Sequence, residues 1–528
     1  MRTRRSGANG EDPAARPRAD ATSHTDASRG WPRSLVAAGL VAMLSVGALH
    51  LWYPFSGDQA LFALGADELR HGRHLYTDFW DNKQPGIYWF FLAARQLLGP
   101  GEFAVHAVEL AWLALAAVIA VLGIRPELTH RSLAALLPLA SIGLYYASAG
   151  SWHLTQVEIL VSLPIVACLA LLSRPYRLPG RRRLATGTAG VLIVTTALFK
   201  LLLVVIPVSF LLLCALVRRR GGERPADLAL GLLLPAAIGA VISATAVLAY
   251  LYATGTLAAA YWTSFSLPPL LLAAIPGPPL ARLGGSIEWF ARATWPLWPF
   301  AAAGTIVALR RRTVFLLGAV AWLLLGLAVI LLQRLSWWQY HFMLLMMPLG
   351  ILAVAGMDWL LAGIGTWLGA RPAARVAGAL LCLAPLLVAV AMPAAAKLRL
   401  LSSADFDAQR IQLAVDGGTR KVRQTAELVA ARHPGPDAVA VFGDPRILLL
   451  LHARQATRLS GWTFYLPEQV RELAGELATL RPRLVYVGTR DYELLTYRSN
   501  AFAAVLHERY AAIARDASGG VWYELIPE

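Results

Sequence analysis

One polar stretch near the N-terminus carries the residues best suited to chemistry. Asp58 follows Gly57 and precedes a segment, residues 61–72, whose leucines have helical spacing. Two compatible interpretations of Asp58 are open. One is a functional carboxylate, and the other is an N-cap, whose oxygen accepts hydrogen bonds from the amides two and three residues further on.

The same stretch continues with three charged residues, Asp78, Asp81 and Lys83, among carboxamides and aromatic side chains. Pro85 then opens a second apolar helix, predicted over 87–98, that is too short to span a bilayer and is expected at the interface or dipping into the protein. A lysine just ahead of a helix N-terminus at membrane depth suits an anionic phosphate, because its charge and the helix amides act together. Snorkelling of Lys83 towards water is the alternative.

Glu158 lies about one turn inside an apolar helix. A carboxylate there is costly unless it is paired or lines a hydrated cavity, so we predict a site role for it. His153 and Gln156 precede it and are weaker candidates. Lys200 separates two apolar runs, where it either adds positive charge for a phosphate or snorkels.

A further short polar segment, 333–341, contains Arg334, Tyr340 and His341. Arg334 is the one strong cation of that segment. Arginine donates to phosphate in a fixed, bidentate geometry, so Arg334 ranks second to Lys83 as a phosphate ligand.

These segments are held by a chain that belongs in a membrane, since 57% of its 528 residues are hydrophobic and 15% are charged. The apolar runs predict about eleven crossings. The runs are 34–52, 103–124, 132–148, 156–173, 185–199, 201–217, 227–252, 294–309, 313–332, 342–361 and 376–396.

The net charge of +16 comes from arginine clusters between the apolar runs, which favours a positive cytoplasmic face over a nucleic-acid surface. One alternation places all these clusters in the cytoplasm with the N-terminus. The exported parts are then 53–101, 149–155, 253–293, 333–341 and the last 130 or so residues. Tryptophans at run ends predict an interfacial aromatic belt, formed by Trp289, Trp295, Trp298, Trp337 and Trp338.

We therefore expect a polytopic α-helical membrane protein in three parts. Residues 1–32 form a disordered basic cytoplasmic tail, 33–399 a multi-helix transmembrane catalytic domain, and 400–528 a small extracytoplasmic α/β domain. Within the last part, strands are predicted at 437–443 and 483–489, and helices at 421–433, 468–480 and 500–514. The segment 442–445 is predicted to be a turn that ends a strand.

The first exported loop resembles that of the GT-C glycosyltransferases, most nearly the family 39-like branch of protein O-mannosyltransferases and the lipid A aminoarabinose transferase. The matching segments are 72–78, read as Gly-x-x-x-Tyr-x-Asp, and 81–85, which ends in Lys-x-Pro. The resemblance implies a GT-C-like fold, with Asp58 as catalytic base and Lys83 at the donor phosphate. An acid at the position of Glu158 also looks like the family pattern.

One departure from the family concerns Gln59, where relatives often carry a second acid. This weakens a paired-acid or metal-dependent site. No cofactor is expected, and a divalent cation stays open. No metal ligands are predicted.

The resemblance implies transfer of a monosaccharide from a polyprenyl phosphate to an exported hydroxyl, in a bacterial-type inner or plasma membrane. One carboxylate takes the acceptor proton, cations stabilise the leaving phosphate, and direct displacement inverts the anomeric centre. The sugar is undefined, and the acceptor is a glycan, a lipid or a protein of the cell envelope. A transporter or a non-catalytic envelope scaffold is the alternative, although no inverted repeat is visible among the apolar runs.

Overall fold

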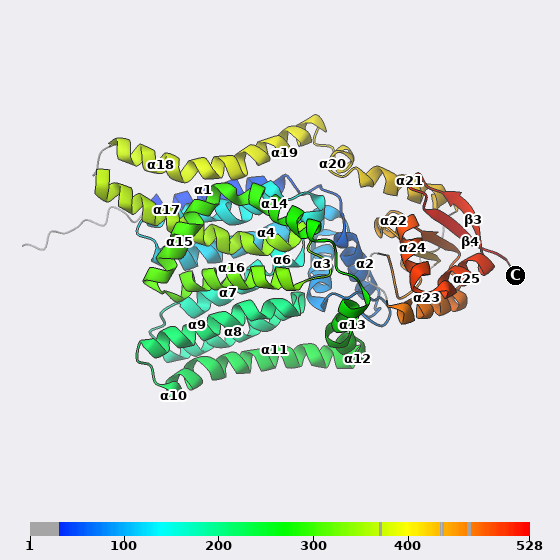
Figure 1. Cartoon of the computed structure of the whole chain (residues 1–528), viewed down its shortest axis with the longest axis horizontal. Coiled ribbons are helices and arrows are strands. Elements are labelled where there is room, and N and C mark those ends of the chain that lie inside the picture. Colours follow the sequence, from blue (N-terminus) through cyan, green and yellow to red (C-terminus); the bar gives the residue numbers. More distant parts are fainter. Residues whose placement is uncertain (1–30, 369–371, 433–434, 436–437, 462–465, 528) are drawn as a thin grey trace, which may run out of the picture.

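The computed structural model describes residues 31–368, 372–432, 435, 438–461 and 466–527. A body of packed helices carries a small α/β domain at one end (Figure 1). Of the predicted tail 1–32, residues 1–30 lie outside the described part, so the expected disorder is not addressed.

All eleven predicted apolar runs coincide with helical segments. In chain order, these are α1 (Trp31–Ala48), α4 (Glu102–Ile124), η2 to α5 (Arg131–Leu136, Leu139–Gly143, Leu144–Ser148), α6 and α7 (Val157–Leu160, Ser162–Ser173), α8 (Pro179–Phe199), η5 and α9 (Leu201–Val204, Val205–Arg220), α10 to α11 (Pro225–Leu228, Ala229–Leu233, Leu234–Ala253), α15 (Trp298–Arg311), α16 (Val314–Leu332), η9 and α17 (Gln339–Leu345, Met346–Leu368), and α18 to α19 (Pro372–Leu386, Leu387–Ala391, Met392–Ser403).

Within the described residues, seven helices are long and apolar enough to cross a membrane. The chain is therefore a multi-pass membrane protein, while the number of eleven crossings stays a prediction. One of the seven, Leu257–Ala274, lies in the predicted exported loop 253–293. That loop is thus largely helical, and it contains α12 (Leu257–Tyr261), α13 (Leu267–Ala274) and α14 (Leu280–Thr294).

Small residues let helices of the body approach closely. A Cβ atom added to Gly239 of α11 would lie 1.9 Å from the backbone oxygen of Gly187 in α8. A Cβ on Gly356 of α17 would meet the oxygen of Phe300 in α15 at the same distance. In lipid, where apolar burial adds little between helices, such backbone approach is a main source of association.

Two short helices of the first loop lie where the helical body meets the α/β domain (Figure 1). They are α2 (Asp58–Arg70) and α3 (Pro85–Leu98), and α2 begins one turn earlier than its predicted start at Leu61. The rings of Phe62 and Tyr88 meet edge to face at 5.7 Å between centroids. This contact fixes the two helices against each other.

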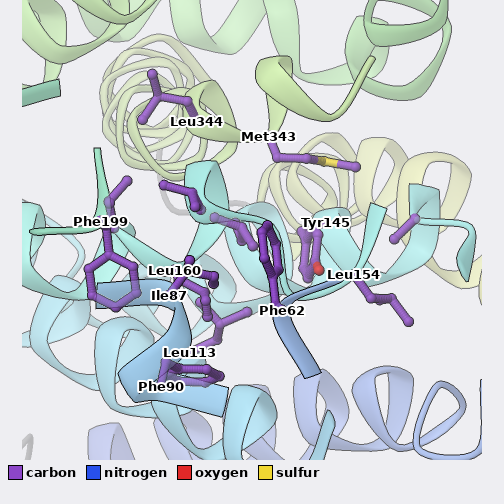
Figure 2. Packing of buried hydrophobic residues seen from close by; sticks show 14 of the residues in the cluster. Phe62, Ile87, Phe90, Leu113, Tyr145, Leu154, Leu160, Phe199, Met343 and Leu344 are labelled. Carbon is purple, nitrogen blue, oxygen red and sulfur yellow. The ribbon is translucent and has the colours of Figure 1, made fainter. Parts of the chain in front are cut away.

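Figure 2 shows the apolar layer that supports this junction. It gathers buried side chains from elements far apart in the sequence, including Phe62, Ile87, Leu160, Phe199 and Met343. Each belongs to, or directly adjoins, a segment that also carries a predicted polar candidate. Dense packing of these residues therefore limits the freedom of the polar groups next to them.

The α/β domain contains a four-stranded sheet in the order β1-β2-β4-β3. β1 (Val439–Phe442) pairs in parallel with β2 (Leu484–Val487), and β4 (Val521–Leu525) pairs antiparallel with β2 and with β3 (Tyr510–Arg515). The helices are α20 (Ala408–Val415), α21 (Gly418–Ala430), α22 (Arg446–Leu450), α23 (Pro467–Leu480), α24 (Thr489–Arg498) and α25 (Asn500–Arg509).

Most predicted elements of this domain are confirmed, including both strands and the turn after Phe442. The predicted helix 500–514 is wrong beyond Arg509, where the chain enters β3. Ala511 and Ala512 favour helix by intrinsic propensity, but pairing with β4 outweighs it.

Candidate active site

Asp58 is the first residue of α2, and Gly57, with a positive φ of 62°, is the N-cap. The predicted N-cap role of Asp58 is therefore wrong, because Gly57 already occupies that position. The Asp58 carboxylate instead lies 3.6 Å from the Lys83 ammonium, and the Tyr340 hydroxyl donates to it over a long 3.5 Å. Its side chain is 23% exposed, so it stays accessible to a substrate.

Lys83 lies two residues before α3, as predicted. Its ammonium donates to the Asn82 side chain at 3.3 Å and lies 5.8 Å from the centre of the Phe62 ring. Burial lowers the pKa of Lys83, but Asp58, Asp81 and Glu158 outweigh it, and the net shift is upward. Lys83 is therefore a positive charge held by loose contacts.

The two other acids of the first loop shape its backbone. Asp81 is buried, accepts a hydrogen bond from the Tyr88 hydroxyl, and accepts another from the Asn82 amide at 2.7 Å. Asp78 accepts from the His74 amide at 2.7 Å. These bonds fold the loop so that the Lys83 ammonium reaches Asp58.

Glu158, in α6, is 2% exposed and holds two partners. Lys200, which follows α8, donates to it at 2.6 Å, and Nδ1 of His341 in η9 donates at 2.8 Å. The Lys200 ammonium also donates to the side-chain oxygen of Gln333. Three distant segments thus meet at one buried carboxylate, as expected of an acid inside a membrane helix.

The second loop is tied to α2 by Gln59. Its amide donates to the backbone oxygens of Ser151, at 3.1 Å, and Leu154. A carboxylate cannot donate these bonds, which gives a structural reason for an amide instead of an acid at position 59.

His153 and Gln156 support the same loop. His153 accepts from the Gly150 amide at 2.9 Å and stacks on Trp289 at 4.8 Å between ring centres. Burial lowers the pKa of His153 to about 4, so the ring is neutral at pH 7. Gln156 donates to the Trp152 backbone oxygen at 3.1 Å. No described contact joins either side chain to Asp58.

Arg334 is exposed. Among the contacts of the described residues, none joins its side chain to Asp58, Lys83 or Glu158. The prediction that Arg334 is the second phosphate ligand after Lys83 therefore receives no geometric support. Lys200, by contrast, pairs directly with Glu158.

Sequence reasoning did not single out two ionisable residues of the helical body, the buried Glu109 and the partly exposed Lys397. Glu109, in α4, accepts hydrogen bonds from the Tyr145 hydroxyl at 2.5 Å and from the Thr155 hydroxyl at 2.7 Å. The bond to Thr155 holds that residue in a backbone conformation with a φ of +52°. Lys397, in α19, donates to His50 at 2.8 Å and to the backbone oxygens of Tyr146 and Ala149. Both lie in or next to apolar runs, and that placement was the available signal.

The α/β domain closes over the first loop. Arg446 pairs with Asp416 and Asp444 and also donates to the Phe55 backbone oxygen at 3.2 Å. The Trp80 amide donates to the Arg458 oxygen at 2.9 Å. These bonds hold the backbone on both sides of α2 and Asp58.

Two polar groups result, one of Asp58, Lys83 and Tyr340 and one of Glu158, Lys200 and His341. They adjoin through Tyr340 and His341, whose ring centres are 4.5 Å apart, and together we call them the polar cluster. It offers one accessible carboxylate for a proton and two ammonium groups for an anion. Among the residues that the structure describes, no three His, Cys, Asp or Glu side chains are grouped to hold a metal ion.

This architecture, a helical membrane body with two short first-loop helices beneath a small α/β domain, is the GT-C fold of membrane glycosyltransferases. The structure is similar to ArnT from Cupriavidus metallidurans in the apo state, with a TM-score of 0.61 and 15% identity over 94% of this chain and 99% of that one. It is similar to ArnT bound to undecaprenyl phosphate, with a TM-score of 0.59 and 14% identity over 95% and 100% of the two chains.

A more distant similarity joins it to the oligosaccharyltransferase of Archaeoglobus fulgidus in the apo form. The TM-score is 0.53 and the identity 12%, over 94% of this chain and 75% of that one. No protein-family model and no curated protein sequence matches the chain. The fold predicted from the resemblance is therefore confirmed by structure, at identities that show the fold alone.

Proposed function

We propose that this protein is a membrane glycosyltransferase that moves a monosaccharide from a polyprenyl-phosphate donor to a hydroxyl group. The observation that carries the proposal is the accessible Asp58 carboxylate, 3.6 Å from the Lys83 ammonium, at the loop junction of a GT-C fold. A structural neighbour with the same fold binds undecaprenyl phosphate, which supports a lipid-linked donor.

In this mechanism Asp58 takes the proton of the acceptor hydroxyl as its oxygen attacks the anomeric carbon. The bond between that carbon and the phosphate oxygen breaks, and the phosphate leaves with the electron pair. Phosphate needs no general acid as a leaving group, so one carboxylate suffices, and a single displacement inverts the anomeric centre. Asp58 ends the step protonated and returns the proton to water.

The cations stabilise the charge that develops on the phosphate. Lys83 is the direct ligand, because its ammonium is 28% exposed and held by long contacts that a phosphate can replace. Lys200 adds a second positive charge and is fixed by Glu158, whose other partner is His341. Arg334 has no contact with this group, and we give it no role in phosphate binding.

We further propose that this site faces outward from the cytoplasm in a bacterial-type plasma membrane. The arginine clusters then lie in the cytoplasm with the N-terminus, and the α/β domain lies outside. A polyprenyl phosphate fits this geometry, since its chain stays in the bilayer while its phosphate reaches the loop. The product is then a cell-envelope glycan, glycolipid or glycoprotein.

Mass spectrometry of lipid extracts tests the proposal in cells that lack the protein. We expect a polyprenyl-phosphate sugar to accumulate and one envelope glycan to lose that sugar, with both restored by the wild-type chain but not by Asp58→Asn. Extracts and glycans identical to those of wild-type cells, or rescue by Asp58→Asn, would contradict a transferase and favour a transporter or a scaffold.

A further inference from the structure

Several aromatic side chains lie near Asp58. A Cβ atom added to Gly57 would lie 3.8 Å from the Cβ of Trp152, so the Trp152 side chain begins next to the residue before Asp58. The Tyr340 hydroxyl contacts Asp58 itself, and its ring centre lies 6.1 Å from that of Trp152. Trp338 continues the row, 6.2 Å from Trp152. We call Trp152, Trp338 and Tyr340 the aromatic arm.

The rings of the aromatic arm are packed against one another at steep angles. Trp152 meets Trp338 at 87° and Tyr340 at 84°, so neighbouring rings of the arm stand nearly at right angles, and the His153 ring lies against Trp152 with 4.2 Å between centres. The Arg282 guanidinium lies 4.3 Å from the Trp338 ring centre and fixes it by a cation–π contact. All three rings of the arm are at least partly exposed, with Trp338 at 37%.

An interfacial belt does not account for this arrangement. The predicted belt included Trp338 and Trp289, but these rings turn onto Trp152 and His153 of the second loop. Trp295 and Trp298 are 58% and 44% exposed at the start of α15, as a lipid-facing belt requires. The belt stays a prediction, and within it Trp338 differs by its contact with Trp152 of the second loop.

The surface of a sugar ring is chemically complementary to such aromatic rings. One of its faces is a patch of C–H groups, and its rim carries hydroxyls. Aromatic faces are electron-rich and attract those C–H groups, while the rim stays free to form hydrogen bonds. A corner of two rings holds one face and one edge of the sugar, which orients a rim hydroxyl.

We propose that the acceptor is a carbohydrate and that its terminal sugar stacks on Trp152 and Trp338, which presents a hydroxyl to Asp58. This inference rests on the proposed function and names the acceptor class, which that function leaves open. Lys83, 3.6 Å from the same carboxylate, holds the donor phosphate, so donor and acceptor meet at Asp58.

Saturation-transfer NMR on the full chain in lipid nanodiscs tests the inference. The probes are neutral and uronate-containing di- and trisaccharides, serine- and threonine-containing peptides, and undecaprenyl phosphate as an independent reporter of the donor side. We expect saccharides to bind through their ring C–H groups and peptides not to bind. Trp152→Ala and Trp338→Ala should each weaken saccharide binding about tenfold, which is the order of one lost stacking contact. Trp152→Phe should retain most of it.

Trp295→Ala and Trp298→Ala are matched controls that should leave saccharide binding unchanged. Binding of peptides in place of saccharides, or equal losses in the arm and control variants, would overturn the inference. So would the absence of saccharide binding in a preparation that still binds undecaprenyl phosphate. Loss of undecaprenyl phosphate binding by the wild-type chain would instead count against the proposed function, so the two failures are distinguishable.

Discussion

Replacing Lys83 with methionine separates phosphate binding from structural support. The ammonium makes long contacts, 3.3 Å to Asn82 and 3.6 Å to Asp58, and is 28% exposed. A partly exposed pair of this kind contributes about 0–1 kcal/mol to stability, so Lys83→Met should fold almost as well as the wild type. Methionine keeps most of the apolar length over Phe62 and removes the charge.

The expected loss in donor affinity is much larger. A hydrogen bond to a charged group contributes about 1.5–3 kcal/mol, and each 1.4 kcal/mol is tenfold in affinity, so undecaprenyl phosphate should bind about 10- to 100-fold more weakly. Titration of nanodisc-embedded protein with undecaprenyl phosphate measures this. The wild-type affinity should also fall with rising salt more steeply than that of the variant.

Two comparison variants, Lys200→Met and Arg334→Met, distinguish a loss of phosphate affinity from a loss of stability. Lys200→Met leaves the buried Glu158 carboxylate with one partner fewer, so it should destabilise the protein by about 3 kcal/mol, unlike Lys83→Met. Arg334→Met should change neither stability nor affinity, because no described contact links it to the cluster. Wild-type affinity in Lys83→Met, or a greater loss in Arg334→Met, would refute the assignment of the phosphate to Lys83.

Three other changes have defined outcomes. Glu158→Gln should lower the free energy of unfolding by about 3 kcal/mol, since it removes the charge that holds Lys200 and His341. Chemical denaturation in detergent measures this. A free energy of unfolding equal to that of the wild type would contradict the pairing of Glu158 with both residues. Gln59→Glu should lower the free energy of unfolding by on the order of 2 kcal/mol, because the new side chain cannot donate to the backbone oxygens of the second loop. Gln59→Met also cannot donate but carries no charge, so it separates the effect of the lost hydrogen bonds from that of the added charge. Wild-type stability of both variants would contradict a stabilising role of these hydrogen bonds. Burial raises the pKa of Asp491, in the α/β domain, to about 6. The folded domain then binds this proton more tightly than the unfolded chain, so its stability should fall as pH rises from about 4 to 6, and Asp491→Asn should remove that slope in hydrogen exchange.

The sequence predicted the main layout of the molecule because hydrophobic periodicity is local. Apolar runs located the eleven helical segments, and the loop composition singled out Asp58, Lys83 and Glu158. Their pairings were not predictable in detail. Glu158 and His341 are 183 residues apart, and their contact depends on how α6 packs against η9.

Two errors have clear physical causes. Asp58 was given a possible N-cap role because its residue type fits, but the backbone of Gly57, at φ 62°, takes that position and frees the carboxylate. The hairpin of β3 and β4 was missed because Tyr510–Arg515 contains helix-forming alanines whose strand conformation depends on a partner later in the chain. Lys397 and Glu109, like Glu158, are ionisable residues in or beside apolar runs, and each forms polar contacts with other segments of the chain. Such residues are therefore candidates for the same reason as Glu158.

The most direct test of the central claim is turnover by Asp58→Asn. Purified wild-type and variant protein in nanodiscs would be given the lipid that accumulates in cells lacking the protein, together with envelope material from the same cells. Release of free polyprenyl phosphate measures turnover. The account predicts that Asp58→Asn loses about 10²- to 10⁴-fold in turnover while binding undecaprenyl phosphate as the wild type does. Turnover equal to that of the wild type would contradict Asp58 as the base.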